Sequence, residues 1–164
     1  MNNQIIILMG VAGSGKSTIG SNLSQELDWK FIDSDRLHPQ LNLEKMKKGL
    51  ALTDRDRKPW LQSIRAVIDK ADQKNENIVI ACSALKESYR EYLIQNNKNI
   101  KIIFLKGDLN LIQNRLLSRP HHFFNPRLLQ DQFDTLEEPR NALYIDIFHP
   151  PKDIVNTIRQ SLKI

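Results

Sequence analysis

The chain contains 164 residues, of which 40% are hydrophobic and 26% are charged. This length and composition suit one folded domain, residues 1–164, with its own hydrophobic core, and are short for two domains. The net charge of +5 comes from basic residues scattered among acidic ones, as in residues 45–48 and 55–58. Because a nucleic-acid surface needs a sustained basic stripe, we expect no nucleic-acid partner.

The single cysteine, Cys82, lies inside an apolar run, which excludes an internal disulfide and points to a reducing compartment. We expect it to be buried as a small hydrophobic residue. Residues 1–4 carry no charged side chain, and the apolar run after them is only as long as a strand. Neither a signal peptide nor a membrane partner is therefore predicted, and a cytoplasmic location is favoured.

Apolar strand patterns alternate with helical patterns along the chain. Strands are predicted where Ile, Val, Leu or Phe predominate, at residues 4–9, 30–33, 77–83, 101–106 and 142–147. Helices are predicted between and after them, at residues 16–27, 59–74, 85–95, 109–118 and 151–162. This alternation predicts a parallel sheet with helices on both faces. In such sheets ligands bind beyond the carboxyl ends of the strands, so the residues after each strand are the candidates for function.

The segment after the first strand, GVAGSGKS at residues 10–17, fits the pattern G-x-x-x-x-G-K-[ST]. Glycines let backbone N–H groups close around phosphate oxygens, Lys16 reaches the β- and γ-phosphates, and the Ser17 hydroxyl faces Mg²⁺. A helix beginning at about Lys16 adds the positive end of its dipole. The pattern predicts that a nucleoside triphosphate is bound by Gly10, Ala12, Gly13, Ser14, Gly15, Lys16, Ser17 and Thr18.

Two carboxylates, Asp33 and Asp35, follow the second strand. One residue apart at a strand end, they can face the same cleft, one toward Mg²⁺ and the other toward an acceptor hydroxyl. The alternative is that one of them only caps a helix. The third strand is followed by Ser83 and no Asp, so the carboxylate that often holds Mg²⁺ in P-loop proteins is missing there. Asp33 and Asp35 are expected to replace it.

A charged cluster at residues 54–58 precedes Pro59, at which we predict that a helix begins. Arg57 is the candidate clamp for a carboxylate or phosphate, because a guanidinium binds either group in a bidentate way. Arg55 and Lys58 are expected to be solvated. Trp60 is expected in the core.

The longest irregular stretch lies between the fourth and fifth strands, and residues 119–138 are expected to form a lid. Arg115 and Arg119, four apart on a helix ending at Pro120, are predicted to share its cleft face. Arginines brought in by closure stabilise charge on a transferring phosphoryl group. A surface arginine pair is the alternative. His121 and His122 have no second ligand pair at metal spacing, so no zinc site is expected.

These segments together resemble the small P-loop gluconate kinases, relatives of shikimate and nucleoside-monophosphate kinases. The resemblance runs over nearly the whole chain, and whereas a phosphate loop occurs in very many proteins, the remaining pieces match very few. They are DRLHP at 35–39 with Asn42, Lys45, Met46 and Gly49; DRDRKPWL at 54–61; ACSALK at 81–86 with Tyr89 and Arg90; LKG at 105–107; and His122, Phe123, Leu128, Leu129, Gln132, Phe133, Leu136, Glu137 and Pro139.

The resemblance implies an α/β P-loop NTPase fold of three layers, with a five-stranded parallel sheet, helices on both faces and a small lid. It implies transfer of phosphate from ATP to the 6-hydroxyl of D-gluconate, with Mg²⁺, and self-association as a homodimer. Arg115 and Arg119 are then placed near the nucleotide phosphates. The residues placed near the sugar acid are Asp35, His38, Arg57, Ser83, Arg90 and Gln132.

The expected roles divide the site into three groups. Lys16, Asp33, Asp35 and Arg119 are the expected catalytic residues, with Asp35 favoured to orient or deprotonate the hydroxyl. Ser17 and Asp33 are the expected metal ligands, and the phosphate-loop residues with Arg115 bind the nucleotide.

Two positions depart from the family pattern. Ser34 stands where the family commonly has Gly, and Ala51 stands where it commonly has Pro. Neither change removes a charge, so we expect an altered KM before altered chemistry.

Two other functions stay open from the sequence. Shikimate would suit a similar cationic pocket, whereas a nucleoside monophosphate would need an apolar base pocket and residues 36–58 are mostly polar. The alternative outside the kinases is a non-catalytic module that binds a nucleotide or RNA.

Overall fold

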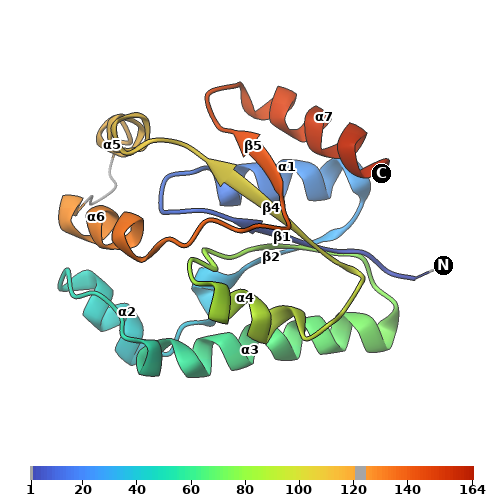
Figure 1. The fold of residues 1–164 in the computed structure, drawn as a ribbon, viewed down its shortest axis with the longest axis horizontal. Coiled ribbons are helices and arrows are strands. Elements are labelled where there is room, and N and C mark those ends of the chain that lie inside the picture. The colour runs from blue at the N-terminus through green and yellow to red at the C-terminus, as the bar shows by residue number, and fades with distance from the viewer. Residues whose placement is uncertain (1, 121–124) are drawn as a thin grey trace.

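The computed structural model describes residues 2–120 and 125–164, which form a three-layer α/β fold (Figure 1). All strands are parallel, and their order in the sheet is β2-β3-β1-β4-β5. The predicted five-stranded parallel sheet is thus confirmed. The strands are β1 (Ile5–Met9), β2 (Lys30–Asp33), β3 (Ile78–Ala81), β4 (Ile100–Lys106) and β5 (Leu143–Asp146).

Helices cover both faces of the sheet, and the central strand β1 is therefore fully buried on both sides. Ile5, Ile7 and Met9 belong to the core cluster shared with α3 (Asp54–Lys74) and α4 (Glu87–Ile94). Ile6 and Leu8 belong to the opposite cluster. That second cluster is shared with α1 (Lys16–Leu27), α5 (Leu109–Leu117) and α7 (Pro151–Leu162). Figure 1 shows α3 and α4 below the sheet and α1 and α7 above it.

Two helices that the sequence patterns did not predict, α2 (Gln40–Lys47) and α6 (Pro126–Thr135), lie beyond the carboxyl ends of the strands (Figure 1). Part of the stretch expected to be irregular is therefore helical. The N-terminus of α6 has a physical cause: the Asn125 side chain accepts a hydrogen bond from the Arg127 N–H, and Pro126 occupies the first helical position. Residues 121–124 of the expected lid lie outside the described residues.

Helix α3 begins at Asp54, five residues before the predicted start at Pro59. Thr53 caps it: its hydroxyl accepts from the Asp56 N–H, and the Asp56 carboxylate accepts from the Thr53 N–H. This reciprocal capping box satisfies two N–H groups that the helix itself cannot bond. Lys45 also binds Asp56, and its hydrogen bond is the main reason that the pKa of this carboxyl falls to about 2. The earlier start places Arg57 on the helix.

Cys82 is a free, fully buried cysteine, as expected, and burial raises the pKa of its thiol to about 11. Trp60 is 1% exposed and belongs to the core, also as expected. Across residues 2–120 and 125–164, no helix is both long and apolar enough to cross a membrane.

Candidate active site

The loop between β1 and α1 forms the wall of a pocket at the carboxyl end of the sheet. Gly13 and Gly15 adopt left-handed backbone conformations, with φ of 78° and 97°, that disfavour side chains. Lys16 Nζ donates hydrogen bonds to the carbonyls of Gly10 and Val11, each at 2.9 Å. Burial lowers the pKa of Lys16, while the nearby Asp35 opposes that shift. We call this space the phosphate pocket; it is lined by Ala12, Gly13, Gly15, Lys16, Ser17, Thr18, Asp35, Leu116, Arg119 and Pro120.

Asp33 caps a short helix and also contacts the phosphate loop. Its Oδ1 caps the short 3₁₀ helix Ser34–Leu37 by accepting a hydrogen bond from the Asp35 N–H at 3.0 Å. Its Oδ2 accepts one from the Ser17 hydroxyl at 2.9 Å. Asp33 and Ser17 therefore place a carboxylate and a hydroxyl oxygen side by side at the edge of the phosphate pocket. Hard cations such as Mg²⁺ prefer oxygen ligands of these kinds.

A second pocket, the acceptor pocket, lies next to the first. Its lining comes from the segments that follow β1, β2 and β3, from helices α1, α2, α3 and α6, and from the loop between α2 and α3. It consists of Ala12, Lys16, Asp35, His38, Met46, Leu50, Ala51, Leu52, Arg57, Trp60, Ser83, Leu85, Leu128, Asp131, Gln132 and Thr135. Ala12, Lys16 and Asp35 line both pockets. The two spaces thus meet at one cation and one carboxylate, which is the arrangement that direct transfer of a phosphoryl group requires.

Asp35 is open toward the pockets but surrounded by protein on its other sides, and the resulting loss of water raises its pKa. Lys16 opposes this shift and Asp33 adds to it. A raised pKa makes a carboxylate a better proton acceptor at neutral pH. Asp35 therefore lies where the two pockets meet and has a pKa above its usual value.

His38 lies flat against Trp60, with ring centroids 4.5 Å apart and an angle of 9° between the planes. Its Nδ1 lies 3.2 Å from the Asn42 side-chain amide, which can donate to it. Burial, with a smaller contribution from Arg57, lowers the pKa of His38 to about 4. The ring is therefore neutral at pH 7, and with Asn42 donating to Nδ1, the proton is on Nε2.

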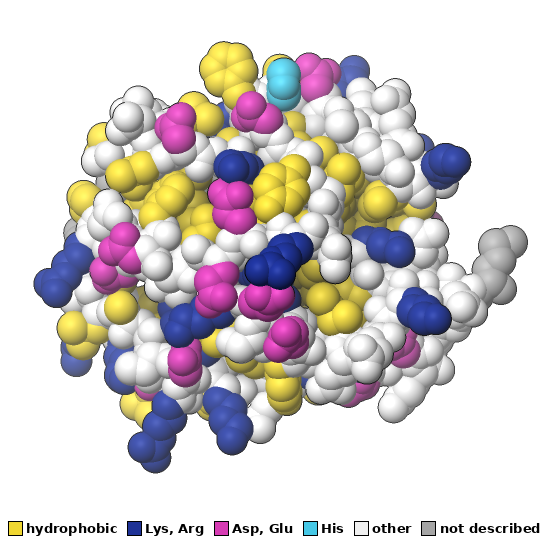
Figure 2. Space-filling model, in the orientation of Figure 1, with side chains coloured by type: hydrophobic (Ala, Val, Ile, Leu, Met, Phe, Trp, Pro, Cys, Tyr) yellow, Lys and Arg dark blue, Asp and Glu magenta, His cyan; other side chains and the backbone are white. Residues whose placement is uncertain are grey.

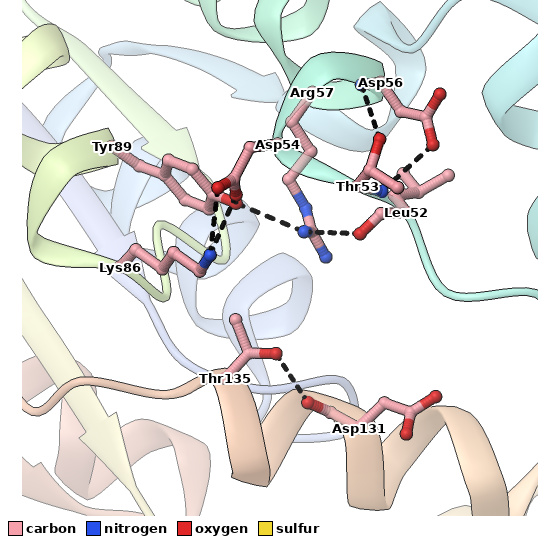
Figure 3. Close-up of polar contacts among 9 residues, drawn as sticks. All are labelled: Leu52, Thr53, Asp54, Asp56, Arg57, Lys86, Tyr89, Asp131 and Thr135. Carbon is pink, nitrogen blue, oxygen red and sulfur yellow. Dashed lines mark hydrogen bonds and ion pairs between the residues drawn. The ribbon is translucent and has the colours of Figure 1, made fainter.

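Arg57 extends from α3 into the acceptor pocket, opposite α6 (Figure 3). Its Nη1 donates to the Leu52 carbonyl at 2.8 Å and to the Tyr89 hydroxyl at 3.2 Å. The flanking Arg55 and Lys58 are exposed, as expected, and line neither pocket. Arg57 is thus the arginine of this segment that reaches the acceptor pocket.

Helix α6 closes the acceptor pocket on the far side and contacts the phosphate loop. Gln132 Oε1 accepts a hydrogen bond from the Ala12 backbone N–H at 2.6 Å. Asp131 and Thr135 line the same pocket from one turn of the helix. Neither residue was among those expected at the site from the sequence. The sequence did contain a signal for them. Asp131 is adjacent to the expected ligand Gln132, and Thr135 lies four residues after Asp131, so that both fall on one side of the helix.

The structure brings His38, Arg57, Ser83 and Gln132 together around the acceptor pocket, but not Arg90. Arg90 is 5% exposed, and its guanidinium donates to the carbonyls of Ala84, Leu85 and Glu137. It joins the loop after β3 to the segment after α6. The sequence led us to expect Arg90 at the acceptor pocket, but its guanidinium donates to backbone carbonyls instead.

Arg115 and Arg119 were predicted to share a helical face, and this prediction is wrong. Helix α5 ends at Leu117, so Arg119 lies beyond it and lines the phosphate pocket. Arg115 donates a hydrogen bond to the carbonyl of Ile147, after β5. His121 and His122 lie outside the described residues. Within the described ranges, no group of three or more His, Cys, Asp or Glu side chains could hold a metal ion by itself.

A family model described as shikimate kinase matches residues 12–160. The thermoresistant gluconokinase of Escherichia coli K12 is 42% identical over 166 residues, which cover 99% of this chain and 95% of that relative. The crystal structure of a gluconokinase from Sinorhizobium meliloti 1021 matches with a TM-score of 0.83 at 36% identity, over 98% of this chain and 95% of that one. The chain belongs to the gluconokinase family. A shikimate kinase structure from Bacteroides thetaiotaomicron, at 20% identity and a TM-score of 0.69 over 98% and 99% of the two chains, shares the fold.

Membership of the gluconokinase family confirms the resemblance drawn from the sequence. The chain is a P-loop kinase, a phosphotransferase with an alcohol group as acceptor. Such an enzyme needs two adjacent substrate sites, and the phosphate pocket and the acceptor pocket are adjacent spaces that share Ala12, Lys16 and Asp35. Kinases of this class take the phosphoryl group from a nucleoside triphosphate, and the phosphate loop provides its binding site.

Proposed function

We propose that the chain transfers the γ-phosphoryl group of ATP to the 6-hydroxyl of D-gluconate. The observation that carries this proposal is that Lys16 and Asp35 line both pockets. The hydroxyl oxygen attacks the γ-phosphorus, the bond to ADP breaks, and Asp35 accepts the hydroxyl proton. Lys16 stabilises the charge on the phosphoryl oxygens during transfer, and Arg119 faces the same space from the end of α5.

The acceptor is held by charge at one end and by hydrogen bonds along its length. Arg57 binds the carboxylate, which places the opposite end of the linear chain at Asp35. His38, Ser83 and Gln132 bind hydroxyl groups between these ends. With its proton on Nε2, His38 donates one hydrogen bond into the pocket. A sugar without a carboxylate, such as glucose, leaves Arg57 unpaired and is therefore a poor acceptor.

Mg²⁺ would be held by Ser17 and Asp33, whose oxygens lie 2.9 Å apart at the phosphate pocket. When bound, the ion neutralises charge on the phosphates. The chemistry of the two side chains fits it, because both offer hard oxygen ligands.

The remaining proposals concern the cell. The free buried Cys82 supports a reducing, cytoplasmic compartment. A homodimer is proposed from the family resemblance. Light scattering of the purified chain, which measures its molar mass in solution, tests this proposal. Figure 2 supports a small-molecule acceptor over RNA, because basic side chains on that face lie among acidic ones.

Coupled ADP release with gluconate, shikimate, AMP, CMP and RNA tests the function. We expect release to depend on gluconate and to stay near the background rate with the other four. Release that requires shikimate would transfer the proposal to that acceptor. Release that ignores gluconate but responds to RNA would contradict a sugar-acid kinase.

A further inference from the structure

Three side chains, Asp54, Lys86 and Tyr89, gather on one side of Arg57, and Tyr89 contacts its guanidinium (Figure 3). We propose that these three residues, the α3–α4 cluster, position Arg57 so that its opposite edge meets the carboxylate of the acceptor. The proposal rests on the proposed function, because it takes Arg57 as the carboxylate ligand. It assigns to the cluster a role in acceptor affinity, although none of its members lines the acceptor pocket.

The hydrogen bonds of Arg57 divide its guanidinium into a fixed edge and a free edge. Nη1 donates to the Leu52 carbonyl and to the Tyr89 hydroxyl, which uses both of its hydrogens. Across the described residues, Nε and Nη2 have no hydrogen-bond partner. Nε and Nη2 form a parallel pair of donors that matches the two oxygens of a carboxylate. The free edge therefore suits bidentate binding.

Tyr89 is suited to hold the fixed edge because it is itself held on two sides. It is 5% exposed, and its hydroxyl donates to Asp54, which directs an oxygen lone pair toward Arg57. The Arg57 Cζ and the Lys86 Nζ lie 5.6 and 5.7 Å from the centre of its ring. Both cations thus lie within cation–π range of the same aromatic side chain.

Asp54 and Lys86 complete the cluster. Lys86 Nζ lies 2.9 Å from Asp54 Oδ1. Hydrogen bonds from Tyr89 and then Lys86 hold the pKa of Asp54 below its usual value, so it stays ionised at neutral pH. Burial and the bond to Asp54 raise the pKa of Tyr89, so it keeps its proton. The direction of the hydrogen bond from Tyr89 to Asp54 is therefore constant over the neutral range.

A cluster that served only to join α4 to α3 would affect the stability of the fold but not acceptor binding. The two roles differ in the kinetic parameter that changes. Loss of the positioning role weakens the hold on the gluconate carboxylate and raises the KM for gluconate. It leaves the KM for ATP unchanged, because ATP binds in the phosphate pocket on the far side of Lys16.

The test is a double-mutant cycle on the full chain with gluconate and ATP as substrates. Tyr89→Phe keeps the ring and removes the hydroxyl, and we expect the KM for gluconate to rise about five- to tenfold, the scale of one hydrogen bond. In an Arg57→Ala background, Tyr89→Phe should change this KM less than about twofold, because the group it positions is gone. Tyr92→Phe, at an exposed tyrosine on the same helix, is the matched control and should equal the wild type.

Asp54→Ala is a second test of the positioning role, because this exposed side chain can be removed without creating a cavity in the core. It should raise the KM for gluconate in the same direction, with the KM for ATP unchanged. A Tyr89→Phe enzyme with wild-type KM for gluconate and only a lower thermal midpoint would overturn the positioning role. Equal effects of Tyr89→Phe in the wild-type and Arg57→Ala backgrounds would also overturn it. A wild-type enzyme that does not phosphorylate gluconate overturns the proposed function, and the assignment to Arg57 fails with it.

Discussion

Gln132 on α6 accepts a hydrogen bond from the backbone N–H of Ala12 in the phosphate loop, at 2.6 Å. Ala12 lines both pockets, and Gln132 lines the acceptor pocket. One side chain thus connects the helix that covers the acceptor to the loop that holds the phosphates. The position of α6 and the shape of the loop are therefore linked.

Removal of this hydrogen bond should change the kinetic parameters for both substrates. We expect Gln132→Ala to lower kcat/KM for gluconate about tenfold or more, because it removes a pocket ligand and leaves the Ala12 N–H without its partner. The KM for ATP should rise as well. Gln130→Ala, at an exposed glutamine on the same helix, is the control and should be neutral. An effect of equal size in both variants, measured by steady-state kinetics, would contradict the link.

Asp35→Asn should lower kcat about 10²- to 10⁴-fold, the usual contribution of a general base, with a smaller change in KM. Because burial raises the pKa of Asp35, kcat of the wild type should increase with pH through a pKa above the usual 3.8. The pH–rate profile measures this. A wild-type profile that is flat down to pH 4, together with full activity of Asp35→Asn, would remove Asp35 from this role.

Asp33→Asn should increase the Mg²⁺ concentration needed for half-maximal velocity, because it removes the carboxylate charge next to Ser17. A magnesium titration at saturating ATP and gluconate measures this. Asp69→Asn, on the outer surface of α3, is the control. The same Mg²⁺ requirement in Asp33→Asn and wild type would mean that Asp33 only caps the short helix after β2.

The His38 ring should stay neutral down to about pH 4, and its NMR titration should report that pKa. Below pH 6.5 the unfolded chain binds a proton that the folded chain does not, so His38 makes the fold less stable as pH falls from 6.5 toward 4. His38→Gln should therefore lose less thermal stability than the wild type between pH 7 and pH 5. A titration near pH 6.5 in the folded protein would contradict the buried, stacked ring.

Thr53→Ala should reduce the free energy of unfolding by about 1 kcal/mol, the usual contribution of a helix N-cap. It should also raise the KM for gluconate, because the capped turn carries Leu52 and Arg57. Thr157→Ala, on the exposed surface of α7, is the control for chemical denaturation. If Thr53→Ala is as stable as this control, the capping box does not determine where α3 begins.

The sheet and the phosphate loop could be predicted from the sequence because their signals are local. Each strand is a short apolar run, and the loop pattern directly follows one of them. Helix α6 was missed although its sequence is amphipathic, because the stretch that contains it carries the turn residues Pro120, Asn125 and Pro126. Helix α2 was missed because its sequence is polar, and Asn42 is its one buried residue. Without a broad apolar stripe, a helix of this kind gives little periodic signal.

The site was predicted less completely because it depends on contacts between distant segments. The sequence does not distinguish Arg90 from Arg57. In the structure Arg90 donates to backbone carbonyls, whereas Arg57 lines the acceptor pocket. The bond between Tyr89 and Arg57 joins α4 to α3 across 32 residues. No pattern within either helix carries that information. Ser34, which stands where the family commonly has Gly, is fully buried, and its carbonyl accepts the Trp60 indole N–H at 2.8 Å.

The most direct test of phosphate transfer to the 6-hydroxyl of D-gluconate is to determine the structure of the product. Purified chain, ATP, Mg²⁺ and D-gluconate are incubated together, and the products are analysed by ³¹P NMR with proton coupling. The account predicts one new phosphomonoester signal coupled to the two protons on carbon 6, with one ADP formed for each phosphate transferred. Inorganic phosphate as the sole new signal, or a phosphate coupled to a single proton on a secondary carbon, would contradict it.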